Sequence, residues 1–389
     1  MTAASPETAP RPATHPMFGV VLLSWAHFLN DGAANFLPGI LPALLVALGI
    51  PIGYAGAIIA ILVLGQGLQP FTGALADRWG WRGISAMGLV GSSLGAAWVG
   101  WAHSPASLIA ALALIGVSNS VFHPPALTTV RRLSGGSGEG AMAVFLVGGE
   151  AGRGAWPLLA SVVVVSMGLG GLWVLTLAAA VTVPLLWWQT QPLSRHPSTV
   201  SAWQGVRDAG RPLLMVITYS SLRAVLLFGL AAFIPLWWEA RGGSLITGAA
   251  LITAFLLVGI AGNLGSAVLA RHFGRRRLVI AGTLAGVGLE AAFMLSSGAW
   301  LWITLSGVGI ALFGTLPLTV LMGQDLLPRH PSLGGGLALG FCNALGALIV
   351  APLGALAAVW GPVAVLWAVE ACGVAALAFA FFLPVGARG

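Results

Sequence analysis

The stretch QTQPLSRHPSTVSAWQGVRDAGR, residues 189–211, is the only long polar interruption in this chain after residue 16. It lies near the middle of the 389 residues, with six long apolar runs before it and six after it. A helix needs about 20 apolar residues to cross the hydrocarbon core of a bilayer. The position of this polar stretch therefore predicts two halves of six membrane-spanning helices each, joined by a linker.

The composition supports a membrane protein. Hydrophobic residues make up 58% of the chain and charged residues 7%, whereas soluble domains carry about 25% charged residues. The 55 glycines and 23 prolines suit spanning helices, which pack closely through small residues and tolerate proline. Continuous apolar runs exclude a strand barrel, whose strands alternate. We expect an all-α membrane protein of twelve transmembrane helices in two six-helix bundles.

The apolar runs define the expected domain boundaries. We expect spans at roughly 17–47, 53–76, 83–102, 106–130, 140–166, 168–189, 212–238, 246–270, 278–297, 300–326, 335–358 and 362–385. The predicted organisation is a disordered cytoplasmic tail (1–16), an N-terminal bundle (17–189), a cytoplasmic linker (190–211) and a C-terminal bundle (212–389).

The arginines predict the orientation in the membrane. With the N-terminus in the cytoplasm, fourteen of the seventeen arginines fall in the tail, the even-numbered loops and the C-terminus. The opposite face has only Arg241, and Arg153 and Arg223 lie within spans. Since basic residues favour cytoplasmic loops, we expect both termini in the cytoplasm of a bacterial cell, with the chain in its inner membrane.

Several polar residues lie inside the spans, where they are costly. His27, Asp31 and Asn35 are spaced four apart and share one helix face. At 1.5 Å per residue, Asp31 lies about 20 Å along its helix, near the middle of the membrane. Glu150 and Arg153 of the fifth span and Arg223 of the seventh reach a similar depth.

The cost of these charges predicts where they face. At roughly 2.5 to 3.5 kcal/mol for each charge at a helix centre, four of them cost about 10 to 14 kcal/mol if they face lipid. We therefore expect them to face a cavity or each other. We expect proton coupling by Asp31, with Glu150, His27 and His123 as further candidates, and substrate binding by Asp31, Asn35, Asn30, Glu150, Arg153 and Arg223.

Two alternatives remain open for this set. Glu150 and Arg153 are three residues apart, so they could simply neutralise one another as a packing pair. His123 is followed by two prolines and could either relay protons or bond carbonyls of an interrupted helix. Elsewhere, Glu290 and Glu370 are expected to be isolated structural acids, and Gln66 and Asn343 are expected to bond either substrate or neighbouring helices.

The loop after the second span carries a recognisable motif. GALADRWGWR, residues 73–82, resembles the loop signature of the major facilitator superfamily, with Gly73, Asp77, Arg78, Gly80 and Arg82 in the matching positions. The resemblance implies a cytoplasmic gate at these residues; the alternative is an ordinary charged loop. The equivalent stretch in the second half, SAVLARHFGRRR (266–277), has Arg271 where the acid stands in the first.

A closer resemblance runs through most of the chain. HFLND (27–31), NSVFHPPA (119–126), FLVGGEAGRGAWP (145–157), SLRAVLLFGLAAFIPLW (221–237) and GQDLLPRHPSLGGGLALGF (323–341) look like the fosmidomycin-resistance branch of that superfamily. The resemblance implies bacterial drug export driven by proton exchange. Glu150 and Arg153 depart from the branch, which more usually has neutral residues there.

These observations together predict a secondary active transporter. We expect it to export a small organic compound, a drug or toxic metabolite that is anionic, zwitterionic or amphiphilic, by proton antiport and alternating access. Uptake or facilitated diffusion of an organic anion is the alternative, and a non-transporting membrane receptor is a third reading.

Other classes of protein are not expected. The chain contains no phosphate-binding loop and no protease-like motif, so neither direct use of ATP nor an enzyme is predicted. Both cysteines lie inside apolar runs, and no cofactor or metal is expected. The expected partners are substrate, protons and lipid, without nucleic acid, and the expected state is a monomer.

Overall fold

The computed structural model describes residues 16–69, 71–72, 83–133, 139–189, 202–328 and 331–385. The first half contains α1 (Pro16–Asn35), α2 (Leu37–Ala47), η1 (Ile52–Tyr54), α3 (Ala55–Gln66), α5 (Ile84–Gly100), α6 (Pro105–Leu133), α7 (Glu139–Met167), η3 (Leu169–Thr176) and α8 (Leu177–Gln189). The second half contains α9 (Ala202–Ala240), α10 (Leu245–Phe273), α11 (Arg275–Leu295), α12 (Ala299–Leu326), α13 (Pro331–Gly336), η4 (Leu337–Phe341), α14 (Cys342–Trp360) and α15 (Pro362–Ala380).

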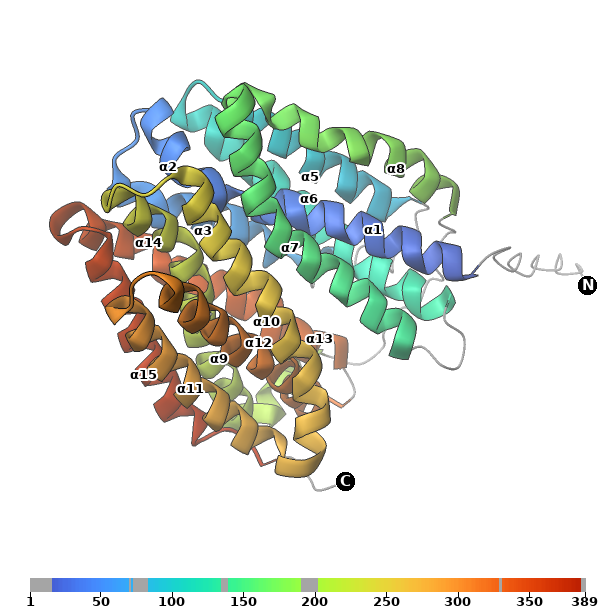
Figure 1. Ribbon diagram of the computed structural model, residues 1–389. Coiled ribbons are helices and arrows are strands. Elements are labelled where there is room, and N and C mark those ends of the chain that lie inside the picture. The colour runs from blue at the N-terminus through green and yellow to red at the C-terminus, as the bar shows by residue number, and fades with distance from the viewer. Residues whose placement is uncertain are drawn as a thin grey trace, which may run out of the picture.

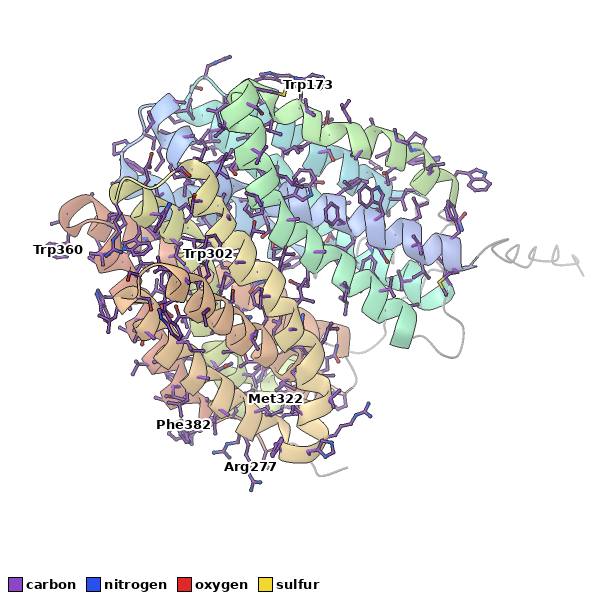
Figure 2. The ribbon with its side chains drawn as sticks, viewed as in Figure 1. Trp173, Arg277, Trp302, Met322, Trp360 and Phe382 are labelled. Atoms are coloured by element: carbon purple, nitrogen blue, oxygen red, sulfur yellow. The ribbon has the colours of Figure 1, made fainter. Side chains whose placement is uncertain are left out.

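The described part of the chain is helical throughout its assigned elements, and the predicted fold class is confirmed. Eight of its helices are long and apolar enough to cross a membrane, and Ile52–Gln66 and Ile84–Gly100 are shorter apolar helices. Figure 1 shows the first half (blue to green) beside the second (yellow-green to red). Large apolar side chains such as Trp173, Trp360 and Phe382 project from the outside, where lipid would cover them (Figure 2).

Residues 1–15 of the expected tail and residues 190–201 of the expected linker lie outside the described residues. The remaining linker residues belong to α9, which has non-helical backbone at Gly210 (φ 47°, ψ −130°). Only glycine adopts such angles without steric strain. Residues 202–209 therefore form a short helix that changes direction before the seventh span begins.

The first span is interrupted next to its polar residues. α1 ends at Asn35 and α2 begins at Leu37, with Pro38 in the first turn of α2. Proline is tolerated there because the first amides of a helix need no partner within it. The Asn35 side chain donates a hydrogen bond to the Asp31 carbonyl at 2.8 Å. The first span is therefore made of two helices, with one residue between them directly after Asn35.

Glycines of α7 set its distance from α1. A Cβ atom at Gly149 would lie 2.3 Å from the His27 ring, and one at Gly152 would lie 2.1 Å from the Phe28 carbonyl oxygen. Larger residues at these positions would push the helices apart. The glycines in the sequence VGGEAGRG therefore bring α7 close enough for its charged side chains to reach the polar face of α1.

The two halves meet through pairs of helices. α3 packs against α14, and α7 packs against α10. A Cβ atom at Gly56 would lie 2.3 Å from the Val350 carbonyl oxygen, and one at Gly354 would lie 2.0 Å from the Gly53 carbonyl oxygen. Glycine thus allows backbone-to-backbone contact between the halves.

Candidate functional site

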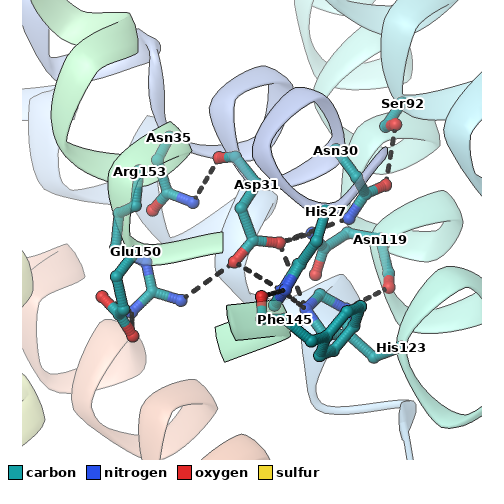
Figure 3. Close-up of polar contacts among 10 residues, drawn as sticks. All are labelled: His27, Asn30, Asp31, Asn35, Ser92, Asn119, His123, Phe145, Glu150 and Arg153. Atoms are coloured by element: carbon teal, nitrogen blue, oxygen red, sulfur yellow. Dashed lines mark hydrogen bonds and ion pairs between the residues drawn. The ribbon is translucent and has the colours of Figure 1, made fainter. Parts of the chain in front are cut away.

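Asp31 lies at the centre of a polar cluster within the first half (Figure 3). Its side chain is 3% exposed. His123 Nε2 lies 3.1 Å from Oδ1, while His27 Nε2 and Arg153 Nη2 lie 3.4 Å and 3.3 Å from Oδ2. The cluster therefore draws side chains from α1, α6 and α7 onto one carboxylate.

Amide groups complete the surroundings of this carboxylate. Asn30 and Asn119 each donate to Asp31 Oδ1, at 3.3 Å and 3.2 Å. Ser92 of α5 donates to the Asn30 Oδ1 atom at 2.9 Å and thereby orients that amide. An ionised carboxylate only accepts hydrogen bonds, so a set of donors around both oxygens suits the charged form of Asp31.

The two histidines have their Nδ1 atoms engaged by backbone. His27 Nδ1 lies 2.8 Å from the Phe145 carbonyl oxygen, and His123 Nδ1 lies 2.8 Å from the Asn119 carbonyl oxygen. A carbonyl oxygen can only accept, so each Nδ1 must carry a proton. His123 therefore bonds a helix carbonyl, which is one of its two expected roles, and its Nε2 atom also reaches Asp31. The proton relay stays a prediction.

This assignment leaves the two Nε2 atoms facing each other at 3.1 Å. Two bare lone pairs would repel at that separation, so the arrangement is favourable only when one Nε2 carries a proton and its ring is an imidazolium. The Phe145 ring stacks on His27 with centroids 4.2 Å apart, where an aromatic face stabilises a cation. The two Nε2 atoms and the Asp31 carboxylate thus lie within 4.8 Å of one another.

Arg153 links this cluster to Glu150. Its Nη1 atom lies 3.3 Å from Glu150 Oε1, while Nη2 contacts Asp31. The two residues are therefore more than a closed packing pair, because one guanidinium bridges two carboxylates. One arginine and two carboxylates leave the network one net negative charge while both imidazoles are neutral. A single added proton makes it neutral.

A pocket lies against this network and between the two halves. The space between its walls is about 540 Å³, including the part open to solvent. The first half contributes Ala34, Asn35, Leu37, Pro38, Ile59, Leu62, Val63, Gln66 and Arg153, and the second contributes Leu227, Phe228, Ala231, Leu256 and Asn343.

The residues expected to bind substrate occupy different positions around this pocket. Asn35 and Arg153 line it. Asn30 and Asp31 are 0% and 2% exposed and lie behind the wall, and Glu150 reaches it through Arg153. Asn343, for which the sequence left two roles open, lines the pocket, and its Oδ1 atom has no hydrogen-bond partner within the described ranges.

Arg223 stands apart from the network. Its residue is 3% exposed, and its Nε and Nη2 atoms have no hydrogen-bond partner among the residues that the structure describes. It lies one turn of α9 before Leu227, a pocket residue. The sequence correctly singled out this charge, but the structure does not place it in an ion pair with Asp31 or Glu150.

One expectation about the second half is wrong. Glu290 of α11 and Glu370 of α15 are not isolated, because their carboxyl groups interact with each other where these two helices pack. The two glutamates are 80 positions apart, so their spacing along the chain could not predict the contact between them. Neither residue lines the pocket between the halves.

Two further site residues had no role in the sequence-based prediction. Asn119 and Ser92 hold Asp31 directly and through Asn30. Asn119 precedes His123 by four residues, and this spacing was a usable signal because it places both on one helix face. The predicted gate residues Gly73, Asp77, Arg78, Gly80 and Arg82 lie outside the described residues, so the gate stays a prediction.

Apolar helices arranged in two halves, with a polar cluster beside a pocket between them, are features of a secondary transporter. The family model described as Major Facilitator Superfamily matches residues 23–351. The chain therefore belongs to the major facilitator superfamily.

Individual relatives agree with this assignment. The chain is 27% identical over 359 residues to the fosmidomycin resistance protein of Escherichia coli (strain K12), covering 87% of this chain and 86% of that one. It is 25% identical over 366 residues to the uncharacterized MFS-type transporter YfnC of Bacillus subtilis (strain 168), covering 90% and 89%.

Solved structures share the fold. A bacterial homolog of the human lysosomal transporter Spinster, in an inward-facing and unoccupied conformation, superposes with a TM-score of 0.76 at 15% identity and covers 96% of each chain. The nucleoside transporter NupG gives 0.76 at 13% identity, over 94% of this chain and 98% of that one.

Proposed function

We propose that this protein exports a small organic compound, a drug or toxic metabolite, in exchange for protons. The observation that carries the proposal is the His27, Asp31 and His123 cluster, which can gain or lose one proton next to a pocket between the halves. The similarity to a fosmidomycin resistance protein supports the export direction. Alternating access would expose the pocket to each side of the membrane in turn.

Exchange requires that substrate binding expels the proton, and the net charge of the network allows this. Without the proton it carries one net negative charge. A cationic substrate group at Glu150 would neutralise that charge in place of the proton, so each ligand would disfavour the other. We propose that Asn35, Arg153 and Asn343 contact the substrate at the pocket wall, while Asp31 and the histidines handle the proton.

Loss of the proton would also move helices. The shared proton ties His27 of α1 to His123 of α6, and without it the two Nε2 lone pairs repel at 3.1 Å. The same carboxylate holds Arg153 of α7, which lines the pocket and whose helix contacts α10 in the other half. Gain or loss of the proton would thereby alter the contact between α7 and α10, which lie in different halves.

The experiment is transport into and out of liposomes that contain the purified protein. A growth screen of an expressing strain against toxic compounds identifies the substrate, and its flux is then measured under imposed pH gradients. We expect a gradient to drive exchange in the wild type and in H103Q, which alters an exposed loop histidine. We expect D31N and H123Q to lose the gradient dependence while remaining folded. Wild-type flux that ignores the gradient would refute proton exchange.

A second candidate is movement of an organic anion by uptake or facilitated diffusion. The buried Arg223 favours it, since its Nε and Nη2 atoms have no hydrogen-bond partner among the described residues and such a cation gains most from an anionic partner. An anion that drew Arg153 away from Asp31 would strengthen proton retention, so this candidate predicts that proton and substrate move in the same direction or that the gradient has no effect. The direction of flux under a pH gradient separates the two.

We also propose that the protein is a monomer in a bacterial inner membrane. The distribution of arginine further leads us to propose that both termini lie in the cytoplasm. R241C places a thiol in the short loop after α9, while Cys342 is buried. A membrane-impermeant maleimide should label this variant in intact spheroplasts. Labelling only after the membrane is opened would show that the protein has the opposite orientation.

A further inference from the structure

We propose that His27, Asp31 and His123 form a binding site for a divalent transition metal ion, with Zn²⁺ as the ion that fits best. The three residues offer ligand atoms that all lie within 4.8 Å of one another. The site goes beyond the proposed transport activity and does not depend on it, because it can be measured at equilibrium in the purified protein.

The separations of the ligand atoms match a tetrahedral zinc site. Zinc binds imidazole nitrogen and carboxylate oxygen at about 2.0 to 2.2 Å, so two ligands of one tetrahedron are about 3.3 Å apart. His27 Nε2 and His123 Nε2 are 3.1 Å apart, and their distances to the nearer Asp31 oxygens are 3.4 Å and 3.1 Å. An ion could therefore bind with small side-chain adjustments and no movement of the helices.

The groups behind the ligands are those of a metal site. A metal-binding histidine almost always donates its second N–H to a carbonyl or carboxylate, which fixes the ring and its tautomer. Both histidines do so here, to the carbonyls of Phe145 and Asn119. The two Nε2 atoms are therefore the ones available to an ion once any proton on them has left, and donors from Asn30 and Asn119 hold the carboxylate beside them.

The chemistry of the ligands selects the class of ion. Two imidazoles and one carboxylate suit zinc, copper, nickel or cobalt, whereas calcium and magnesium prefer oxygen ligands alone. Three protein ligands leave a fourth position for water. His123 is partly exposed, with 16% of its side chain accessible, and gives an ion a route into the site.

The charges around the site affect both the affinity for an ion and the release of protons when it binds. Histidine binds a metal ion only through an unprotonated nitrogen, so binding would displace any proton held on the two Nε2 atoms. Arg153 lies 3.3 Å from Asp31 Oδ2 and opposes a second cation. Replacing Arg153 should therefore tighten metal binding, although the same replacement leaves carboxylates unpaired. A bound ion would also block proton exchange at this site.

The test uses full-length protein in detergent, with any affinity tag removed and metals stripped by a chelator. Co²⁺ is titrated first, because tetrahedral cobalt absorbs visible light, and Zn²⁺ is then used to displace it. We expect one ion per chain, release of about one proton on binding, at least tenfold weaker binding in H27Q and H123Q, and tighter binding in R153Q. The control H103Q should bind as the wild type does.

Wild-type protein that binds no ion stoichiometrically, or H123Q protein that binds as tightly as wild type, would overturn the proposal. If a histidine variant fails to fold, X-ray absorption of the zinc-loaded wild type decides instead. We expect two imidazole nitrogens and carboxylate or water oxygen at about 2.0 to 2.2 Å. A spectrum dominated by sulfur at about 2.3 Å would assign the ion to cysteine and refute the site.

Discussion

Replacing Arg153 with glutamine should destabilise the protein more than replacing Arg153 and Glu150 together. Arg153 Nη2 and Nη1 lie 3.3 Å from Asp31 Oδ2 and Glu150 Oε1, and the three side chains are 19%, 3% and 14% exposed. R153Q leaves two partly buried carboxylates without their shared cation. Breaking a buried pair costs about 3 to 5 kcal/mol, and the partial exposure of Arg153 favours the lower value.

The second substitution removes one of the two orphaned charges. E150Q/R153Q restores the wild-type net charge of the network and leaves only Asp31 without its arginine, with the histidines still beside it. We expect the double variant to recover about 1 to 2 kcal/mol, which is within the range of coupling between residues in contact. At roughly 2 °C per kcal/mol for a large chain, R153Q should lower Tm by about 6 °C and the double variant by about half as much.

The assay is thermal unfolding in detergent, followed by the fluorescence of the 16 tryptophans at one fixed heating rate. The matched control is R275Q, which breaks the exposed ion pair between Arg275 and Asp325. Exposed pairs contribute less than about 1 kcal/mol, so this control should shift Tm by no more than about 2 °C. A double variant as unstable as R153Q, or less stable, would refute the charge argument.

Three further changes test other parts of the structure. G152A should destabilise the first half by about 1 to 3 kcal/mol, because the new methyl group meets the Phe28 carbonyl at 2.1 Å; an unchanged Tm would contradict the close packing of α1 and α7. E290Q should leave Tm unchanged or raise it, since it removes a potential charge facing Glu370, and a fall of more than about 5 °C would show that the carboxyl group is needed for stability. R223Q should leave Tm unchanged or raise it, because an unpaired buried charge is unfavourable. The same variant should weaken the binding of anionic substrates in an equilibrium assay. Lower stability would mean that Arg223 has a partner in the folded protein.

Hydropathy alone was enough to predict the fold class. Runs of about 20 apolar residues must form spanning helices, because lipid offers no hydrogen-bond partner to a free backbone. The polar stretch at 189–211 then divided the chain into halves. The break at Phe36 was also predictable, since Pro38 has no N–H with which to bond the carbonyl of Ala34 four residues earlier.

The candidate site was predictable only in part. The cost of burying charge identified Asp31, Glu150 and Arg153 as residues that must find polar surroundings, and helix spacing put His27 beside Asp31. The approach of His123 and Asn119 to that carboxylate depends on how α6 packs against α1. Spacing within one helix carries no information about that packing.

The sequence by itself determined that buried charges exist, how deep each lies in its helix and which side chains share a face, because local helix geometry and the cost of charge in lipid follow from residue order. Only the tertiary structure decided which charges meet. It placed the Nε2 atoms of the two histidines 3.1 Å apart, placed Arg153 between two carboxylates, left Arg223 without an ion-pair partner in the described part of the chain and brought Glu290 to Glu370. These pairings depend on contacts between helices that are distant in sequence. Glycines at some of those contacts let the helices approach closely enough for the charged side chains to meet.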